Sequence, residues 1–141
     1  MTKTLDELRD QELLPFQAGI DAGADMVMVG HIIVTDVDDV PALFSYTLLT
    51  EVLRGEMGFE GVIVSDALEM QALTQYYEED EIVVLAIQAG ADMLLCPTDL
   101  NAAVNAILRA TEAGELSVER IDDSVLRILA LKDHLGLLSE G

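Results

Sequence analysis

The chain has little positive charge and no long apolar run. Seven Lys and Arg stand against 27 Asp and Glu, which gives a formal net charge of −20. Such a surface repels nucleic-acid phosphates and anionic lipid headgroups, so we expect neither nucleic acid nor a membrane as a partner. No run approaches the roughly 18 apolar residues of a membrane-spanning helix.

Cysteine is nearly absent as well. Cys96 is the single cysteine, so it forms no internal disulfide and by itself no zinc site. It follows an apolar run at 93–95, and we expect it to be a small buried hydrophobe. The first residues also lack the basic start and apolar middle of a secretory signal, so we place the chain in the cytoplasm by default.

What the chain does have is enough apolar material for one folded domain. Its 141 residues are 51% hydrophobic, which excludes disorder on composition. A domain of this size buries roughly 68% of the surface that its unfolded chain exposes. We therefore expect a single domain with a substantial core.

Short apolar runs alternate with helical patterns along the chain. The runs lie at 26–29, 61–65 and 92–96, and apolar residues recur at helical spacing between them. This rhythm predicts an α/β fold with three parallel strands and flanking helices. Its two outer strands would have unpaired edges, which a complete barrel or a partner chain would cover.

Helix boundaries are marked by capping residues. Thr4 and Glu7 form a capping box, and the helical segments that follow are expected to break or restart near Pro15 and to end at Gly23. Further caps are predicted at Ser45, Asp80, Asp99 and Ser117, with the helix that follows Asp80 ending at Gly90.

One helix-to-strand junction occurs twice. The sequence Ala-Gly-Ala-Asp-Met stands at 22–26 and again at 89–93. The glycine suits the left-handed end of a helix, and the alanines allow a helix to pack closely on a sheet. The repeat supports a helix–strand unit that occurs twice in the fold, although any α/β protein can reuse such a turn.

Asp66 is the candidate catalytic residue. It follows the apolar segment at 62–64, which is typical of a parallel strand covered on both faces, and ligands bind beyond the carboxyl ends of such strands. A strand-terminal Asp also serves often as a helix cap or a loop acceptor. The pattern by itself leaves both roles open.

Several ordered motifs resemble glycoside hydrolase family 3, the β-N-acetylhexosaminidase and β-glucosidase family. The resemblance covers nearly the whole chain and concerns the carboxyl-terminal part of the catalytic (β/α)8 TIM barrel. The matching segments are 14–16, 22–25, 27–32, 53–54, 58–70, 89–95 and 120–129, with Gly-Phe-Glu-Gly-Val-Ile-Val-Ser-Asp-Ala-Leu-Glu-Met at 58–70 as the longest.

The resemblance implies a chemical role for Asp66. In this family the Asp of the Ser-Asp motif is the nucleophile, so Asp66 would form a glycosyl-enzyme intermediate and retain the anomeric configuration. Met28 and His31 match positions that contact the sugar. A packing role for Met28, or a merely polar role for His31 at a strand end, is the alternative. The implied substrate is a β-linked glycoside, an N-acetylglucosaminide rather than a glucoside, and no cofactor is implied.

The chain also departs from the family pattern. The general acid/base and the Lys-His pair that grips sugar hydroxyls belong to earlier strands, and no Lys-His pair occurs here. The three strands resemble strands six to eight of a barrel that needs roughly 250 residues. We therefore expect residues 1–141 to form a single partial barrel domain without its amino-terminal half, and to have negligible turnover in isolation.

Other interpretations account for fewer residues. A phosphoacceptor receiver domain would place a Lys at a strand end, but Lys3 and Lys132 lie elsewhere. A non-enzymatic fragment that assembles with its own copy, as a homo-oligomer, or with a complementing amino-terminal half remains an alternative. Asp36, Asp38 and Asp39 lack the spacing of a calcium loop, so we predict a solvated loop and no metal site.

Overall fold

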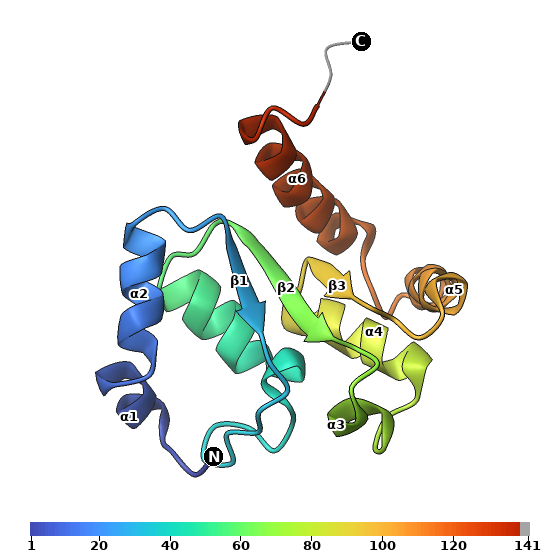
Figure 1. Ribbon diagram of the computed structural model, residues 1–141. Helices are drawn as coiled ribbons and strands as arrows, with labels where there is room; N and C mark the ends of the chain where they lie inside the picture. The colour runs from blue at the N-terminus through green and yellow to red at the C-terminus, as the bar shows by residue number, and fades with distance from the viewer. Residues whose placement is uncertain (139–141) are drawn as a thin grey trace.

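The computed structural model describes residues 1–138 and contains a three-stranded parallel sheet with helices η2 and α4 behind it in the view of Figure 1. The elements are α1 (Leu5–Asp10), α2 (Leu13–Asp21), β1 (Met26–Val29), η1 (Ala42–Phe44), η2 (Thr47–Glu56), β2 (Val62–Ala67), α3 (Gln71–Thr74), α4 (Glu79–Ala89), β3 (Met93–Leu95), α5 (Leu100–Glu112) and α6 (Val118–His134). Within the described residues, no helix is both long and apolar enough to span a bilayer.

The three predicted strands are confirmed. β2 lies between β1 and β3 and runs parallel to both, with Met26 opposite Val62 and Val29 opposite Ser65. β2 continues to Ala67, so Asp66 lies within the end of the strand rather than after it. In the part of the chain that the structure describes, β1 and β3 each pair along one edge only.

The first two helices follow local capping chemistry. The Thr4 hydroxyl accepts a hydrogen bond from the Glu7 amide at 3.3 Å, and a Glu7 carboxylate oxygen accepts one from the Thr4 amide at 2.8 Å, so the predicted capping box is confirmed. The helix restarts at Leu13, two residues before Pro15, so the predicted break or restart near Pro15 is confirmed. Pro15 lies in the first turn of α2, where a missing N–H costs little.

The later caps are confirmed with one exception. Asp99 accepts from the amides of Asn101 and Ala102, and Ser117 accepts from the amide of Arg120. Asp80 is not a cap: α4 begins at Glu79, and Asp80 lies in its first turn. An acidic side chain there is favoured by the helix dipole whether or not it caps.

The helix between β1 and β2 differs from an ordinary α-helix. Ser45 accepts from the amide of Leu48 at 3.1 Å, as predicted, but η2 is a π-helix of ten residues. α4 ends as predicted at Gly90, whose φ of 128° is a conformation that side chains with a Cβ rarely adopt.

The main core lies between the sheet and the helices behind it. Val27, Val29 and Ile63 pack into it from the strands. Met26 and Met28 alternate with the two valines along β1 and are exposed on its other face. The fully buried side chains of this core come from η1, η2, β2, α3 and α4 and include Leu43, Leu49, Ile63, Leu73, Ile82 and Val83.

A buried carboxylate joins four elements at the amino ends of the strands. The Asp92 side chain is fully buried; Oδ2 accepts from the amide of Ile63 at 2.9 Å and pairs with Arg54 of η2. Oδ1 accepts from Ser124 at 2.7 Å and from Arg127 at 3.1 Å, both on α6. We call Asp92 and these partners, together with Arg120, the Asp92 cluster.

Arg120 completes the cluster from α6. Its guanidinium lies 3.7 Å from Asp92 and donates to the carbonyl oxygens of Ile87 and Ala91. Burial lowers the pKa of Arg54 and of Arg120, and the neighbouring Asp92 carboxylate opposes that effect. One carboxylate thus faces three guanidinium groups, and removing it would leave them without their counter-charge.

We predict that Asp92→Asn lowers the free energy of unfolding by about 3–5 kcal/mol, because breaking a buried ion pair leaves uncompensated charge. Urea titration followed by circular dichroism measures the change. Asp80→Asn is the matched control, since it removes an ion pair with Arg109 whose side chains are more than half exposed, and it should cost less than about 1 kcal/mol. Equal losses in the two variants would contradict the role of the Asp92 cluster.

Candidate functional site

The carboxyl ends of the three strands lie at one edge of the sheet. All three arrows in Figure 1 point toward this edge, and the chain leaves β1, β2 and β3 there. Asp66 is the last residue but one of β2, His31 follows β1 by two residues, and Cys96 directly follows β3. The fold therefore brings two of the three predicted site residues, Asp66 and His31, to the same edge.

Asp66 lies in an irregular part of β2. Val64 pairs with Met93 and Ala67 with Leu95, so the segment from Val64 to Ala67 contains one residue more than the matching segment of β3. Such an extra residue is a β-bulge, a feature that redirects side chains and is common beside active sites. The sequence contains no signal for this bulge, because it arises from pairing with a distant strand.

The Asp66 side chain is half-buried and bonded locally. Its Oδ1 accepts a hydrogen bond from the amide of Ala67 at 2.7 Å. A carboxylate with one oxygen held by the backbone and a partly exposed setting keeps oxygen lone pairs for a ligand. This arrangement suits a group that attacks or stabilises a cationic centre.

His31 contacts the same segment from the side of β1. Its Nε2 lies 3.0 Å from the carbonyl oxygen of Ala67, the residue after Asp66. Because a carbonyl oxygen only accepts, Nε2 carries the hydrogen in this contact. Nδ1 is buried and has no hydrogen-bond partner among the described residues.

Met28 lies on β1, three residues before His31. It pairs with Val64, two residues before Asp66, and its side chain is 54% exposed. It lines a mostly apolar cavity of about 200 Å³ together with Phe16 and Ile32. The role of Met28 as a sugar contact stays a prediction.

Ser65 is a residue that sequence reasoning did not single out. Its side chain is completely buried, and its hydroxyl accepts from the amide of Leu95 at 2.9 Å. It stands beside Asp66 in the Ser-Asp motif, but the sequence does not indicate that its hydroxyl reaches β3.

The acidic loop after β1, predicted to be solvated, is largely exposed. Asp36 and Asp39 are exposed, and the half-buried Asp38 accepts from the Ser45 hydroxyl at 2.7 Å. Across residues 1–138, no three His, Cys, Asp or Glu side chains are grouped as metal ligands would be.

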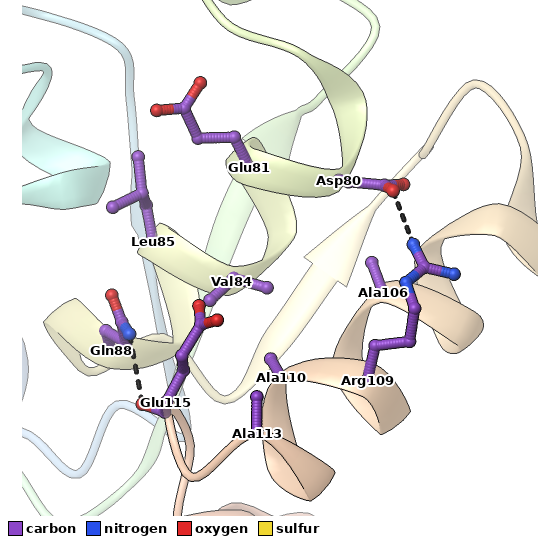
Figure 2. Close-up of a pocket in the computed structure, with 10 residues that line it drawn as sticks. All are labelled: Asp80, Glu81, Val84, Leu85, Gln88, Ala106, Arg109, Ala110, Ala113 and Glu115. Atoms are coloured by element: carbon purple, nitrogen blue, oxygen red, sulfur yellow. Dashed lines mark hydrogen bonds and ion pairs between the residues drawn. The ribbon is translucent and has the colours of Figure 1, made fainter.

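A groove of about 550 Å³ lies apart from this edge, between α4 and α5. Figure 2 shows the Asp80–Arg109 ion pair on one side of the groove and the bond from the Gln88 amide to the Glu115 carbonyl oxygen on the other. Its floor consists of alanine and other apolar side chains from the two helices. None of the predicted site residues lines it.

The comparisons with known proteins agree on one family. The model of the glycosyl hydrolase family 3 N-terminal domain matches residues 1–131. A beta-hexosaminidase of Stenotrophomonas maltophilia (strain R551-3) is 41% identical over 140 residues, which are 99% of this chain and 37% of that protein. A beta-N-acetylglucosaminidase/beta-glucosidase of Cellulomonas fimi is 35% identical over 147 residues, covering 96% of this chain and 26% of that protein.

A solved structure gives the same result. The family 3 beta-N-acetylglucosaminidase of Paenibacillus sp. str. FPU-7 superposes on the whole of this chain and 29% of its own, with a TM-score of 0.92 and 38% identity. The chain thus spans about a third or less of each of these proteins. The α/β fold with three parallel strands and flanking helices corresponds to part of that family's N-terminal domain.

The expectation that Cys96 is buried is wrong. β3 ends at Leu95, and Cys96 has a φ of 47°, which turns the chain out of the sheet and leaves the side chain exposed. We predict that a thiol reagent labels Cys96 in the native chain nearly as fast as in urea. Protection until the chain unfolds would contradict the exposed position.

Proposed function

Because the chain belongs to glycoside hydrolase family 3, we propose that it contributes the nucleophile of a retaining β-N-acetylhexosaminidase and that Asp66 is this nucleophile. The observation that carries the proposal is the half-buried Asp66 carboxylate in a bulge at the carboxyl end of a parallel strand. In barrel enzymes, catalytic residues stand at these strand ends.

The chemistry requires a carboxylate that can form and release a covalent bond. Attack of an Asp66 oxygen on the anomeric carbon forms a glycosyl-enzyme ester as the bond to the leaving-group oxygen breaks and a general acid protonates that oxygen. Water then attacks the same carbon and gives a proton to the conjugate base of that acid, and the ester bond to Asp66 breaks. Two inversions give net retention of configuration.

The proposed substrate is a β-linked N-acetylglucosaminide, with a β-glucoside as the alternative. The names of the Stenotrophomonas and Paenibacillus proteins support the first, and that of the Cellulomonas protein includes both. Met28 and His31 are the proposed sugar contacts on β1 and the segment after it. Their position at or near the carboxyl ends of the strands, where Asp66 lies, supports this role.

We further propose that these 141 residues are one partial barrel domain equivalent to strands six to eight of the family's barrel, located in the cytoplasm. The open edges of β1 and β3 are where neighbouring strands of a barrel, a second copy or a complementing segment would pair. Such pairing would satisfy the free backbone groups of both strands.

A polypeptide limited to residues 1–141 should release negligible reporter from 4-nitrophenyl N-acetyl-β-glucosaminide. General acid assistance contributes typically ~10²–10⁴-fold in rate, and no residue of this chain matches the family's acid/base or its Lys-His pair. Colorimetric assay of the purified chain measures the rate. Turnover well above background that disappears in Asp66→Asn would contradict this prediction.

The role of Asp66 is testable in a chimera. This chain would replace the matching segment of the 41% identical Stenotrophomonas beta-hexosaminidase, and Asp66→Asn should then reduce kcat by at least ~10³-fold, since covalent catalysis is lost. Asp122→Asn, at an exposed position of α6, is the control and should keep the parental rate. Comparable activity in the Asp66→Asn chimera would exclude Asp66 as the nucleophile.

A further inference from the structure

The bulge that contains Asp66 is fixed to both neighbouring strands by side chains. We propose that Ser65 and His31 are positioning residues that hold this bulge and thereby aim the Asp66 carboxylate. The inference rests on the proposed role of Asp66 as nucleophile, and it assigns to the serine of the Ser-Asp motif a function of its own.

Ser65 links the bulge to β3. The register of β2 against β3 shifts between Val64 and Ala67. The buried Ser65 hydroxyl accepts a hydrogen bond from the Leu95 amide at 2.9 Å. Removing this oxygen would take a side-chain acceptor from an amide of the neighbouring strand at the position of the bulge.

His31 holds the other side of Asp66. Its Nε2–H donates to the Ala67 carbonyl oxygen at 3.0 Å, while the next amide, that of Leu68, donates to the carbonyl oxygen of Leu95 at 2.9 Å. Ser65 therefore fixes the residue before Asp66 to β3, and His31 fixes the residue after it to the segment that follows β1. Asp66 is the single residue between these two attachments.

The orientation of the carboxylate follows from this backbone. The Ala67 amide donates to Asp66 Oδ1 at 2.7 Å, so the side chain is oriented by the residue whose carbonyl oxygen His31 holds. Regular pairing would place Asp66, instead of Ala67, opposite Leu95. A one-residue change of register transfers a side chain to the other face of a sheet. Loss of the bulge would therefore change the direction in which the Asp66 carboxylate points.

A second buried serine, Ser124, serves as the comparison because its role is purely structural. Ser124 is also buried, at 7% exposure, and its hydroxyl bonds to Asp92 at the opposite end of the strands. The Ser65 hydroxyl accepts from one amide, whereas the Ser124 hydroxyl donates to Asp92 and accepts from Arg120 at 2.6 Å. A positioning role predicts that only Ser65 affects the geometry of Asp66.

The experiment uses the full 141-residue chain and NMR. Ser65→Ala should make the Leu95 amide exchange roughly 10-fold faster than any change in global stability explains, because the amide loses its side-chain acceptor. It should also move the ¹³C carboxyl signal of Asp66. Ser124→Ala, as the control, should change exchange only in proportion to global stability and leave the Asp66 signal in place.

The His31 pair tests the second attachment independently of Ser65. His31→Gln keeps a side-chain N–H donor and should preserve the Asp66 signal, whereas His31→Leu should shift it. If Ser65→Ala does not fold, these two variants decide the question. An Asp66 signal equally unmoved in His31→Leu and His31→Gln, or unmoved in a folded Ser65→Ala, would overturn the proposal.

The same substitutions in the active chimera separate this inference from the proposed function. Ser65→Ala should lower kcat by roughly 10²-fold with KM little changed, as expected for a misplaced reacting group. If Asp66→Asn loses activity and Ser65→Ala keeps full activity, the positioning role of Ser65 is refuted and the nucleophile assignment stands. Activity that survives Asp66→Asn would refute the nucleophile assignment, and the NMR result for the bulge would be independent of it.

Discussion

The buried carboxylate of Asp92 is the interaction on which the arrangement of sheet and helices depends. It stands where β3 begins, and it accepts hydrogen bonds from the backbone of β2, from Arg54 of η2 and from Ser124 and Arg127 of α6. A lone charge in the interior would be strongly unfavourable, so the carboxylate and its guanidinium partners require each other. Four elements that are distant in sequence are thereby joined at the amino ends of the strands.

The carboxyl ends of the strands are organised differently. There the contacts are single hydrogen bonds from Ser65 and His31 to backbone groups, around a bulge that contains a half-buried acid. Barrel enzymes commonly separate stability at one end of the strands from chemistry at the other. In this chain the charged cluster lies where the strands begin, and the irregular geometry lies at their other ends.

The proposed chemistry of Asp66 rests on membership of the family, and the chain spans only part of the length of its relatives. The relatives are longer proteins, of which the chain spans 26% to 37%. Both outer strands of the described sheet have a free edge, and the sugar-binding Lys-His pair typical of the family does not occur in these residues. The proposed function therefore assigns the nucleophile and two sugar contacts to this chain, and assigns the general acid to none of its residues.

The sequence by itself determined the three strands, the caps at Thr4, Asp99 and Ser117, and the placement of Asp66 at a strand end. These features depend on neighbouring residues: a cap binds amides within its own first turn, and a buried strand is a short apolar run. The bulge at Asp66, the partners of Asp92 and Ser65, and the exposure of Cys96 were decided only by the tertiary structure. Each depends on which distant strand or helix lies alongside, and no local pattern of residues specifies that pairing.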